Sequence, residues 1–280
     1  MLYLLKTVFK KLMSCRRYPI FLGKSFVYRW WPGGFGYYGK LKRCKKEDYD
    51  FEKEKHSVRK KHNAQSGWQK DFAGDFRSRD YLDYNEYVTH QKQKFDEMLK
   101  IDGGFDNKTV FNYRLKFFSR FKKLDRYIKK DAAIICLGAR QGTEVEVLRE
   151  LGYKKAYGID LNPGPDNQLV RYGDFMNMDL DNSSIDLIYS NCLDHTFEIE
   201  KFLQENTRVL KPNGFALYDF ISADCGADGA FEAIAWKNDR YLLDLMLKYF
   251  KKIVRFESGN KWQWILLGGK IENHSRTETA

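Results

Sequence analysis

The sequence has little of what builds linkers, disulfide frameworks or membrane spans. Only five prolines occur among 280 residues, which argues against a linker-rich or fibrous protein. The five cysteines include no Cys-x-x-Cys pair, which argues against a zinc ribbon or a disulfide framework and favours a reducing compartment. No run of about 18 apolar residues or signal-peptide pattern occurs, so the sequence predicts no transmembrane helix and no secretion. We therefore expect a cytoplasmic protein, either free or peripheral at the inner membrane surface.

Acidic residues are absent from residues 1–46, which contain 12 Lys and Arg residues. Residues 1–130 carry 32 basic and 15 acidic residues, whereas residues 131–280 carry 17 and 23. Aromatic residues accompany the early basic ones, as in residues 26–31 (FVYRWW). This composition leaves three interpretations of residues 1–46 open: docking on the protein's own core, contact with an anionic membrane, or, less favoured, contact with nucleic acid.

Helical spacing of apolar residues occurs three times before residue 130. It predicts a short amphipathic helix over residues 1–14 and further helices over residues 84–95 and 111–128. Residues 45–65 mix both charge signs and are typical of a solvated helix or linker. We divide the chain into a basic, aromatic-rich, mainly helical N-terminal extension (1–104), an α/β domain (105–271) and a polar tail (272–280).

From residue 131 the pattern alternates between short apolar runs and helical spacing. The predicted strands are 132–137, 156–159, 169–172, 185–189 and 215–220, with helices over 143–151 and 198–210 between them. A helix over 241–249 and a hairpin of strands 252–256 and 261–267 follow. This alternation predicts a Rossmann-like α/β fold, with a mostly parallel seven-stranded sheet and helices on both faces. Ligands of such sheets bind outside the carboxyl ends of the strands, where the strand order switches.

The residues at the ends of the first two strands suit a nucleoside. Gly138, Ala139 and Gly142 let the backbone approach a ligand and present helix N-terminal N–H groups. Asp160 lies 22 positions after Gly138, the spacing at which a carboxylate accepts hydrogen bonds from ribose hydroxyls. Arg140 occupies the second glycine position of the dinucleotide turn, and the Gly-Lys-Ser/Thr of a P-loop is missing, so a nucleoside without pyrophosphate fits best.

The third and fourth strands end in further candidate residues. Asp174 suits an adenine amino group, and Phe175 offers a ring face. Asp194 and His195 follow the fourth strand and are the nearest candidates for a general base, since histidine titrates near neutral pH. Each of these acids also fits an ordinary turn residue, and His195 also fits a loop cap. The acids of residues 219–228, after the fifth strand, either face an acceptor or lie in a solvated loop. The sequence offers no set of metal ligands.

Five segments together resemble a known family over about residues 130–220. They are 137–146 (LGARQGTEVE), 158–164 (GIDLNPG), 173–175 (GDF), 186–191 (DLIYSN) and 208–214 (RVLKPNG). In order and spacing they are similar to the motifs of class I S-adenosylmethionine-dependent methyltransferases of the type 11 kind. Residues 84–94 resemble the lead-in helix of some bacterial members.

The resemblance implies that S-adenosylmethionine is the cofactor and assigns its contacts. Gly138, Ala139, Arg140 and Gly142 would contact its methionine part, and Asp160 with Leu161 its ribose. Asp174 and Phe175 would contact the adenine, while Asn191 and Leu193 would line the cofactor near the sulfonium.

The family implies three hypotheses for function. The first is methyl transfer to a small-molecule or glycan-type acceptor, at a hydroxyl oxygen, near a membrane. The second is an RNA methyltransferase that uses residues 1–61 as a phosphate-binding arm. The third is a cofactor-binding protein that has lost catalysis and acts as the partner of another enzyme.

Overall fold

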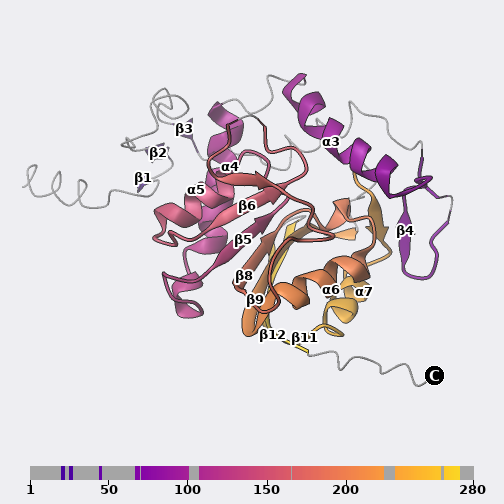
Figure 1. The fold of residues 1–280 in the computed structure, drawn as a ribbon. Helices are drawn as coiled ribbons and strands as arrows, with labels where there is room; N and C mark the ends of the chain where they lie inside the picture. The colour runs from indigo at the N-terminus through magenta and orange to yellow at the C-terminus, as the bar shows by residue number, and fades with distance from the viewer. Residues whose placement is uncertain are drawn as a thin grey trace, which may run out of the picture.

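The computed structural model describes residues 20–22, 25–27, 44–45, 67–69, 71–100, 107–164, 166–223, 231–259 and 262–271. Its main feature is a seven-stranded sheet with the strand order β11-β12-β9-β8-β5-β6-β7 (Figure 1). The strands are β5 (Ile134–Leu137), β6 (Tyr157–Asp160), β7 (Val170–Tyr172), β8 (Ile185–Ser190), β9 (Leu210–Ile221), β11 (Phe250–Gly259) and β12 (Trp262–Lys270). Strand β12 pairs antiparallel with both β11 and β9, and all other neighbouring strands of this sheet pair parallel. The predicted Rossmann-like fold is confirmed.

The strand order switches between β5 and β8. From β5 the chain builds outward through β6 to β7, then returns to place β8 on the other side of β5. All four residues of β5 are buried, as expected for a parallel strand covered on both faces. The carboxyl ends of β5, β6, β7 and β8 therefore meet at one edge of the sheet, around the switch.

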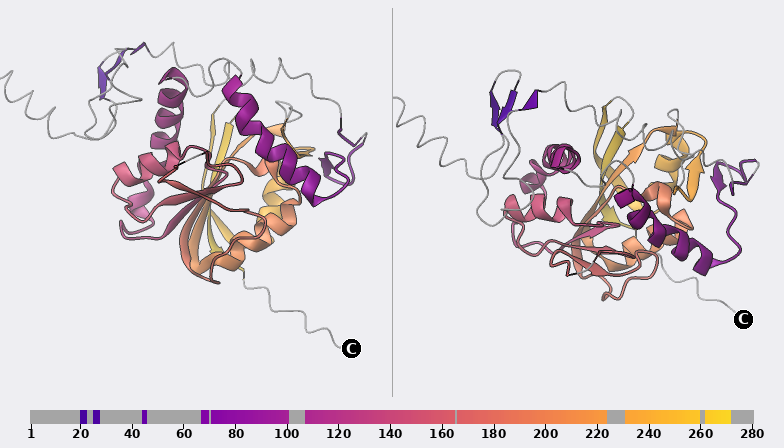
Figure 2. Two further views of the ribbon diagram at one scale, coloured as in Figure 1. Left: turned by 45° about the horizontal axis from the view of Figure 1, so that its top comes forward. Right: turned by 90° about the horizontal axis from the view of Figure 1, so that it is seen from above.

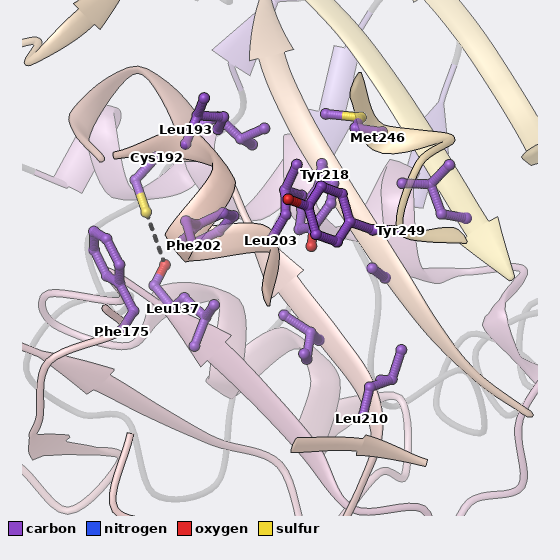
Figure 3. Packing of buried hydrophobic residues seen from close by; sticks show 14 of the residues in the cluster. Leu137, Phe175, Cys192, Leu193, Phe202, Leu203, Leu210, Tyr218, Met246 and Tyr249 are labelled. Carbon is purple, nitrogen blue, oxygen red and sulfur yellow. Dashed lines mark hydrogen bonds between the residues drawn. The ribbon is translucent and has the colours of Figure 1, made fainter. Parts of the chain in front are cut away.

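Helices cover both faces of the sheet (Figures 1 and 2). On one face lie α4 (Asn107–Phe121) and α5 (Thr143–Glu150), whose apolar residues pack on β5, β8 and β9. On the other lie α6 (Ile199–Val209) and α7 (Asp239–Met246). Figure 3 shows part of this second cluster, in which Phe202 of α6 lies near Tyr218 of β9. Both faces are thus apolar and closed.

An ion pair joins the two helices of the first face. Arg114 of α4 is almost fully buried, and its guanidinium donates to Glu146 at 2.8 Å and to both carboxylate oxygens of Glu150. Both acids belong to α5 and lie one helical turn apart, so a single arginine contacts both. This contact fixes α4 against the helix that begins at the glycine turn.

The strand β9 is longer than the sequence predicts. It begins at Leu210, directly after α6, whereas the pattern predicts a stop at residues 211–214 (KPNG) and a strand from Phe215. The register against β8 shifts within this stretch, because Ile185 pairs with Leu210 while Leu187 pairs with Phe215. The turn residues are thus accommodated as an irregularity inside the strand, where Pro212 needs no partner for a backbone N–H.

Residues before 130 contribute strands as well as helices. Three short strands, β1 (Ile20–Leu22), β2 (Ser25–Val27) and β3 (Cys44–Lys45), form an antiparallel sheet that the pattern does not predict. The predicted helix over 84–95 is α3 (Tyr84–Lys100), and the helix predicted over 111–128 is α4 followed by a short 3₁₀ helix, Leu124–Arg126. Another unpredicted strand, β4 (Phe76–Ser78), pairs with β10 (Ile234–Trp236).

Several predictions fall outside the described residues. They are the amphipathic helix over 1–14, the mixed-charge run over 46–65, the boundary at residue 104, residues 224–228 of the loop 219–228, and the tail 272–280. Within the described part of the chain, no helix combines the length and the apolar character that crossing a bilayer requires.

Candidate functional site

The turn between β5 and α5 is built on two glycines with left-handed backbone angles. Gly138 has φ 66° and Gly142 has φ 84°. The N–H groups of Gly138 and Ala139 both donate to the carbonyl oxygen of Ile159, at 2.9 and 3.1 Å. A Cβ at Gly138 would lie 2.8 Å from Sγ of Cys192, so the turn also lies close against the end of β8. This is the small-residue turn that the sequence predicts.

Asp160 at the end of β6 ties this turn to the neighbouring strand. Its Oδ2 accepts a hydrogen bond from the backbone N–H of Arg140 at 2.9 Å, and its Oδ1 accepts one from the N–H of Asn162 at 2.8 Å. Arg140 takes a left-handed angle, φ 47°, at this point. Each carboxylate oxygen keeps a second lone pair, so Asp160 can still accept from ligand hydroxyls. Leu161, the next residue, is largely buried.

Asp174 follows β7 and is bonded on both carboxylate oxygens. Oδ1 accepts from the backbone N–H of Met176 at 2.8 Å, as in an Asx turn. Oδ2 accepts from the hydroxyl of Tyr84, on α3, at 2.5 Å. Burial and this carboxylate raise the pKa of Tyr84 well above its usual value, so the phenol keeps its proton and donates.

Phe175 points into the core rather than outward. It is 6% exposed and meets the ring of Phe202 edge-on at 5.5 Å (Figure 3). One edge of its ring lies beneath Gly138, at 3.8 Å from where a Cβ would be. Phe175 therefore supports the glycine turn from below, and contact between its ring and an adenine stays a prediction.

The residues after β8 form a tight turn that ends in a short 3₁₀ helix, Leu193–His195. Sγ of Cys192 donates to the carbonyl oxygen of Leu137 at 3.4 Å, which joins this turn to the end of β5 (Figure 3). Leu193 is fully buried, whereas Asn191 is partly exposed at the start of the turn. The predicted cofactor residues of β5 and β8 are thus brought to adjacent turns.

His195 has a partner on each ring nitrogen. Nδ1 lies 2.8 Å from the carbonyl oxygen of Phe231, and Nε2 lies 2.5 Å from Nζ of Lys94. A carbonyl oxygen only accepts, so Nδ1 carries the proton and Nε2 accepts from the lysine. Burial, and then the charge of Lys94, lower the pKa of His195 well below its usual value. The imidazole is therefore neutral at neutral pH.

Lys94, whose amine contacts this neutral histidine, also has a shifted pKa. Burial lowers its pKa to about 7, and the positive charge of Arg140 contributes in the same direction. Glu232 and Asp194 act against this shift, since their negative charges favour the ammonium. The charges of both the glycine turn, at Arg140, and the turn after β8, at Asp194, therefore act on Lys94.

One nitrogen and two carboxylate oxygens gather at this point. Asp194, His195 and Glu232 each offer one such atom within 4.8 Å of the others, and all three residues are buried. That spacing would allow a shared cation. The cationic group already beside the imidazole is the amine of Lys94, so we interpret the cluster as built around an amine.

Helix α3 forms one wall of the site. Besides Tyr84 and Lys94 it contributes Tyr87, whose hydroxyl donates to the carbonyl oxygen of His195 at 2.9 Å. Asn162, after β6, donates from Nδ2 to the carbonyl oxygen of Lys92 at 3.2 Å. The helix thus contacts residues that follow β6, β7 and β8, and Figures 1 and 2 show it at that end of the sheet.

Sequence reasoning missed Tyr84, Lys94 and Glu232 as site residues. The only signal for the first two was the resemblance of residues 84–94 to a lead-in helix, which named no individual side chain. Glu232 lies in a stretch without a recognisable pattern. All three lie far along the chain from the residues they contact.

A second buried charge cluster lies on the α4 face. Asp219 of β9 has no exposed surface and pairs with Lys116 at 3.1 Å and Arg120 at 3.2 Å. Burial raises the pKa of Glu144, in the first turn of α5, to about 8. The acid predicted to face an acceptor, Asp219, is thus held by two cations of α4.

The strand-end residues together fit a nucleoside with a short polar extension. Two carboxylates, Asp160 and Asp174, close neighbouring strands, where ribose hydroxyls and an adenine amino group need acceptors. The turn 138–142 has no bulky side chain at either glycine, and α5 begins directly after it.

Comparison with known proteins finds one family model and several solved structures with a similar fold. A family model described as a methyltransferase domain matches residues 135–218. The fold is similar to that of 1,6-didemethyltoxoflavin-N1-methyltransferase from Burkholderia thailandensis, solved with 1,6-didemethyltoxoflavin and S-adenosylhomocysteine; identity is 15%, coverage 74% of this chain and 100% of that one, and the TM-score 0.54. It is also similar to the PH0226 protein of Pyrococcus horikoshii OT3, with 17% identity, 63% and 100% coverage and a TM-score of 0.52. No curated protein sequence matches the chain.

Proposed function

Because the chain contains a class I S-adenosylmethionine-dependent methyltransferase domain, whose cofactor is S-adenosylmethionine, we propose that it methylates a hydroxyl oxygen of a small-molecule or glycan-type acceptor. The observation that carries the proposal is the pair of carboxylates, Asp160 and Asp174, beside the glycine turn at the switch in strand order. Open α/β sheets bind their ligands at this point, which supports the proposal.

The cofactor would lie between these strand ends and α3. Gly138, Ala139, Arg140 and Gly142 would hold its methionine part through backbone N–H groups and, at Arg140, a guanidinium. Asp160 and Leu161 would hold the ribose, and Asp174 with Phe175 the adenine. Asn191 and Leu193 would line the part nearest the sulfonium. The donors and acceptors of these residues match the groups they would meet.

When bound, S-adenosylmethionine supplies an electrophilic methyl group on a positively charged sulfur. The chain's own residues would position the acceptor in line with that group, exclude water and take up the hydroxyl proton. The polar cluster of Asp194, His195 and Lys94 lies beside the predicted cofactor turns and supplies groups for the proton transfer. An acceptor that arrives with a proton to lose, such as a hydroxyl, fits this cluster.

The wall formed by α3 favours a small acceptor over a folded polymer. Tyr84, Tyr87 and Lys94 are each hydrogen-bonded to residues at the strand ends, so the helix covers the site closely. The basic residues 1–46 would then serve to hold the enzyme near an anionic membrane in the cytoplasm, where lipid-linked glycans offer hydroxyls.

One observation favours a second candidate, an RNA methyltransferase. Residues 1–46 carry 12 basic and no acidic residues, which suits phosphate contacts as well as it suits anionic lipids. A cofactor-binding protein without catalysis is the third possibility, and loss of turnover with retained cofactor binding would identify it.

The test begins with calorimetric titration of the full-length chain with S-adenosylhomocysteine. Micromolar binding is expected, and absence of binding to the folded protein would refute the cofactor site. Incubation with methyl-labelled S-adenosylmethionine and a panel of sugars, polyols and RNA then shows which class gains label. Label in RNA alone, lost on deletion of residues 1–46, would overturn the hydroxyl proposal in favour of the second candidate.

A further inference from the structure

We propose that Lys94, on α3, is the general base of the methyl transfer and that His195 is the residue that positions its amine. This assignment rests on the proposed function, because it requires an acceptor that loses a proton. It reverses the roles that residue type alone suggests for the turn after β8, where the histidine is the natural base.

The hydrogen bonds of His195 leave it no free lone pair. Nδ1–H donates to the carbonyl oxygen of Phe231 at 2.8 Å, and the lone pair on Nε2 accepts from Nζ of Lys94 at 2.5 Å. The backbone oxygen of His195 is also held, by the hydroxyl of Tyr87. An imidazole held in this way cannot take a proton from the methyl acceptor unless its hydrogen bond with Lys94 first breaks.

The amine of Lys94 has the opposite property. In its neutral form, nitrogen has two hydrogens and one lone pair. One hydrogen is directed to Nε2 of His195, and the geometry of the amine then leaves the lone pair for another group. His195 therefore acts as a hydrogen-bond acceptor that orients the lysine, as a neighbouring side chain orients the general base in other enzymes.

Charged groups from every neighbouring element act on this amine. Arg140 of the glycine turn favours the neutral form, whereas Asp194 after β8 and Glu232 before β10 favour the ammonium. Together with burial these influences bring the pKa of Lys94 to about 7, close to the pH at which a base works best. The pKa of Cys192, at about 12, keeps that thiol neutral over the same range.

The step balances without a further reactant. The acceptor oxygen forms a bond to the methyl carbon while the electron pair of the carbon–sulfur bond returns to sulfur. The acceptor O–H proton passes to the lone pair on Nζ of Lys94. The products are a methyl ether, a neutral thioether and a lysine ammonium, which later loses its proton to water.

The experiment compares proton release on binding of S-adenosylmethionine and of S-adenosylhomocysteine to the full-length chain. S-adenosylmethionine differs from S-adenosylhomocysteine by its methyl group and the positive charge on its sulfur. Only S-adenosylmethionine should therefore lower the pKa of a base that lies beside the methyl group. At pH 7 a group of pKa about 7 is half protonated, and a nearby positive charge expels that proton. Calorimetry in phosphate and in Tris buffer should show S-adenosylmethionine releasing about 0.3–0.5 proton more than S-adenosylhomocysteine.

Four variants assign the released proton. In Lys94→Met and Lys94→Arg the difference between the two ligands should vanish while S-adenosylhomocysteine still binds. Glu144→Gln is the matched control: the pKa of Glu144 is about 8, but it should respond to both ligands alike, so the difference should persist. In His195→Ala the pH of maximal difference should move below 7, because a charged donor loses more than a neutral one when its acceptor is removed.

The outcomes separate this inference from the proposed function. If neither ligand binds the folded wild-type chain, the proposed function fails. If both bind and release equal numbers of protons, or if the difference survives in Lys94→Met, the base is not Lys94. An unchanged pH maximum in His195→Ala would overturn the positioning role. With any hydroxyl acceptor that gains label, Lys94→Arg should lower kcat by about 10²–10⁴-fold.

Discussion

Replacing Asp160 by asparagine separates two functions of one side chain. The carboxylate accepts from the N–H groups of Arg140 and Asn162, one on each oxygen. An asparagine keeps one acceptor and turns an NH₂ donor toward the other N–H. A hydrogen bond to a charged acceptor contributes about 1.5–3 kcal/mol, so we expect the free energy of unfolding to fall by about 2–3 kcal/mol.

The same substitution should also weaken the ribose contact of Asp160. Loss of a charge-assisted hydrogen bond corresponds to about tenfold in affinity, or about 1.4 kcal/mol. At an S-adenosylhomocysteine concentration of about 100 times the wild-type Kd, the ligand should stabilise the wild type by about 2.7 kcal/mol and the variant by only about 1.4 kcal/mol. Urea unfolding with and without the ligand measures both effects on one sample.

Each result has a distinct meaning. A variant that is less stable but gains as much from the ligand as the wild type would show that Asp160 only organises the turn. A variant unchanged in both respects would refute the hydrogen-bond reasoning. Asp179→Asn is the matched control, because Asp179 is exposed, and its stability should change by less than about 0.5 kcal/mol.

Three further substitutions test the surroundings of the site. Because the pKa of Glu144 is raised to about 8, between pH 4.5 and 8 its carboxyl keeps a proton in the folded state that it has lost in the unfolded state. The free energy of unfolding of the wild type therefore falls as the pH rises through that window. Glu144→Gln should remove this slope, and urea titrations at pH 8 should show the variant to be more stable than the wild type by roughly 2–4 kcal/mol. Gly138→Ala and Gly74→Ala strain nearly the same backbone angle, φ 66° and 67°, but only at residue 138 would the new Cβ clash with a neighbouring atom, at 2.8 Å. In thermal unfolding, Gly138→Ala should therefore lower stability by about 2–4 kcal/mol and Gly74→Ala by about 1 kcal/mol. Equal losses would contradict the close approach at Gly138. Arg114→Ala should lower the free energy of unfolding by about 3 kcal/mol, because it removes the buried cation that pairs with carboxylates of α5. Arg240→Ala removes one member of an exposed ion pair and should lower it by less than about 1 kcal/mol. Similar losses in the two variants would refute the argument from burial.

The sheet could be predicted because its signals are local. The strands β5, β6 and β7 are short runs ended by Gly or Asp, as in residues 132–137 and 156–160, and the alternation with helices predicts parallel pairing. Local signals also explain the error at β9, because residues 211–214 have the composition of a turn. They stay within the strand only because Leu210 before them and Phe215 after them both pair with β8.

The acceptor end of the site could not be predicted in this way. Lys94 meets His195 across 101 positions, and Tyr84 meets Asp174 across 90. No periodicity relates such distant residues, and the helical pattern of residues 84–95 indicates only that a helix exists, not where it docks. His195 was identifiable by type, but its partners on both nitrogens follow from the packing of α3 and residue 231 alone.

The position of α3 has a consequence for how this enzyme can change. The wall over the site belongs to a segment outside the alternating strands and helices, and its polar side chains meet the sheet at the strand ends rather than in the apolar layers. Apart from Tyr84, which packs against the core cluster, and Tyr87, which is fully buried, substitutions along residues 84–94 would therefore alter which acceptor is admitted with little change in the layers that drive folding. Under the proposed function, new acceptor specificity would arise by substitutions in one helix, with the turn 138–142 and the strand ends left unchanged.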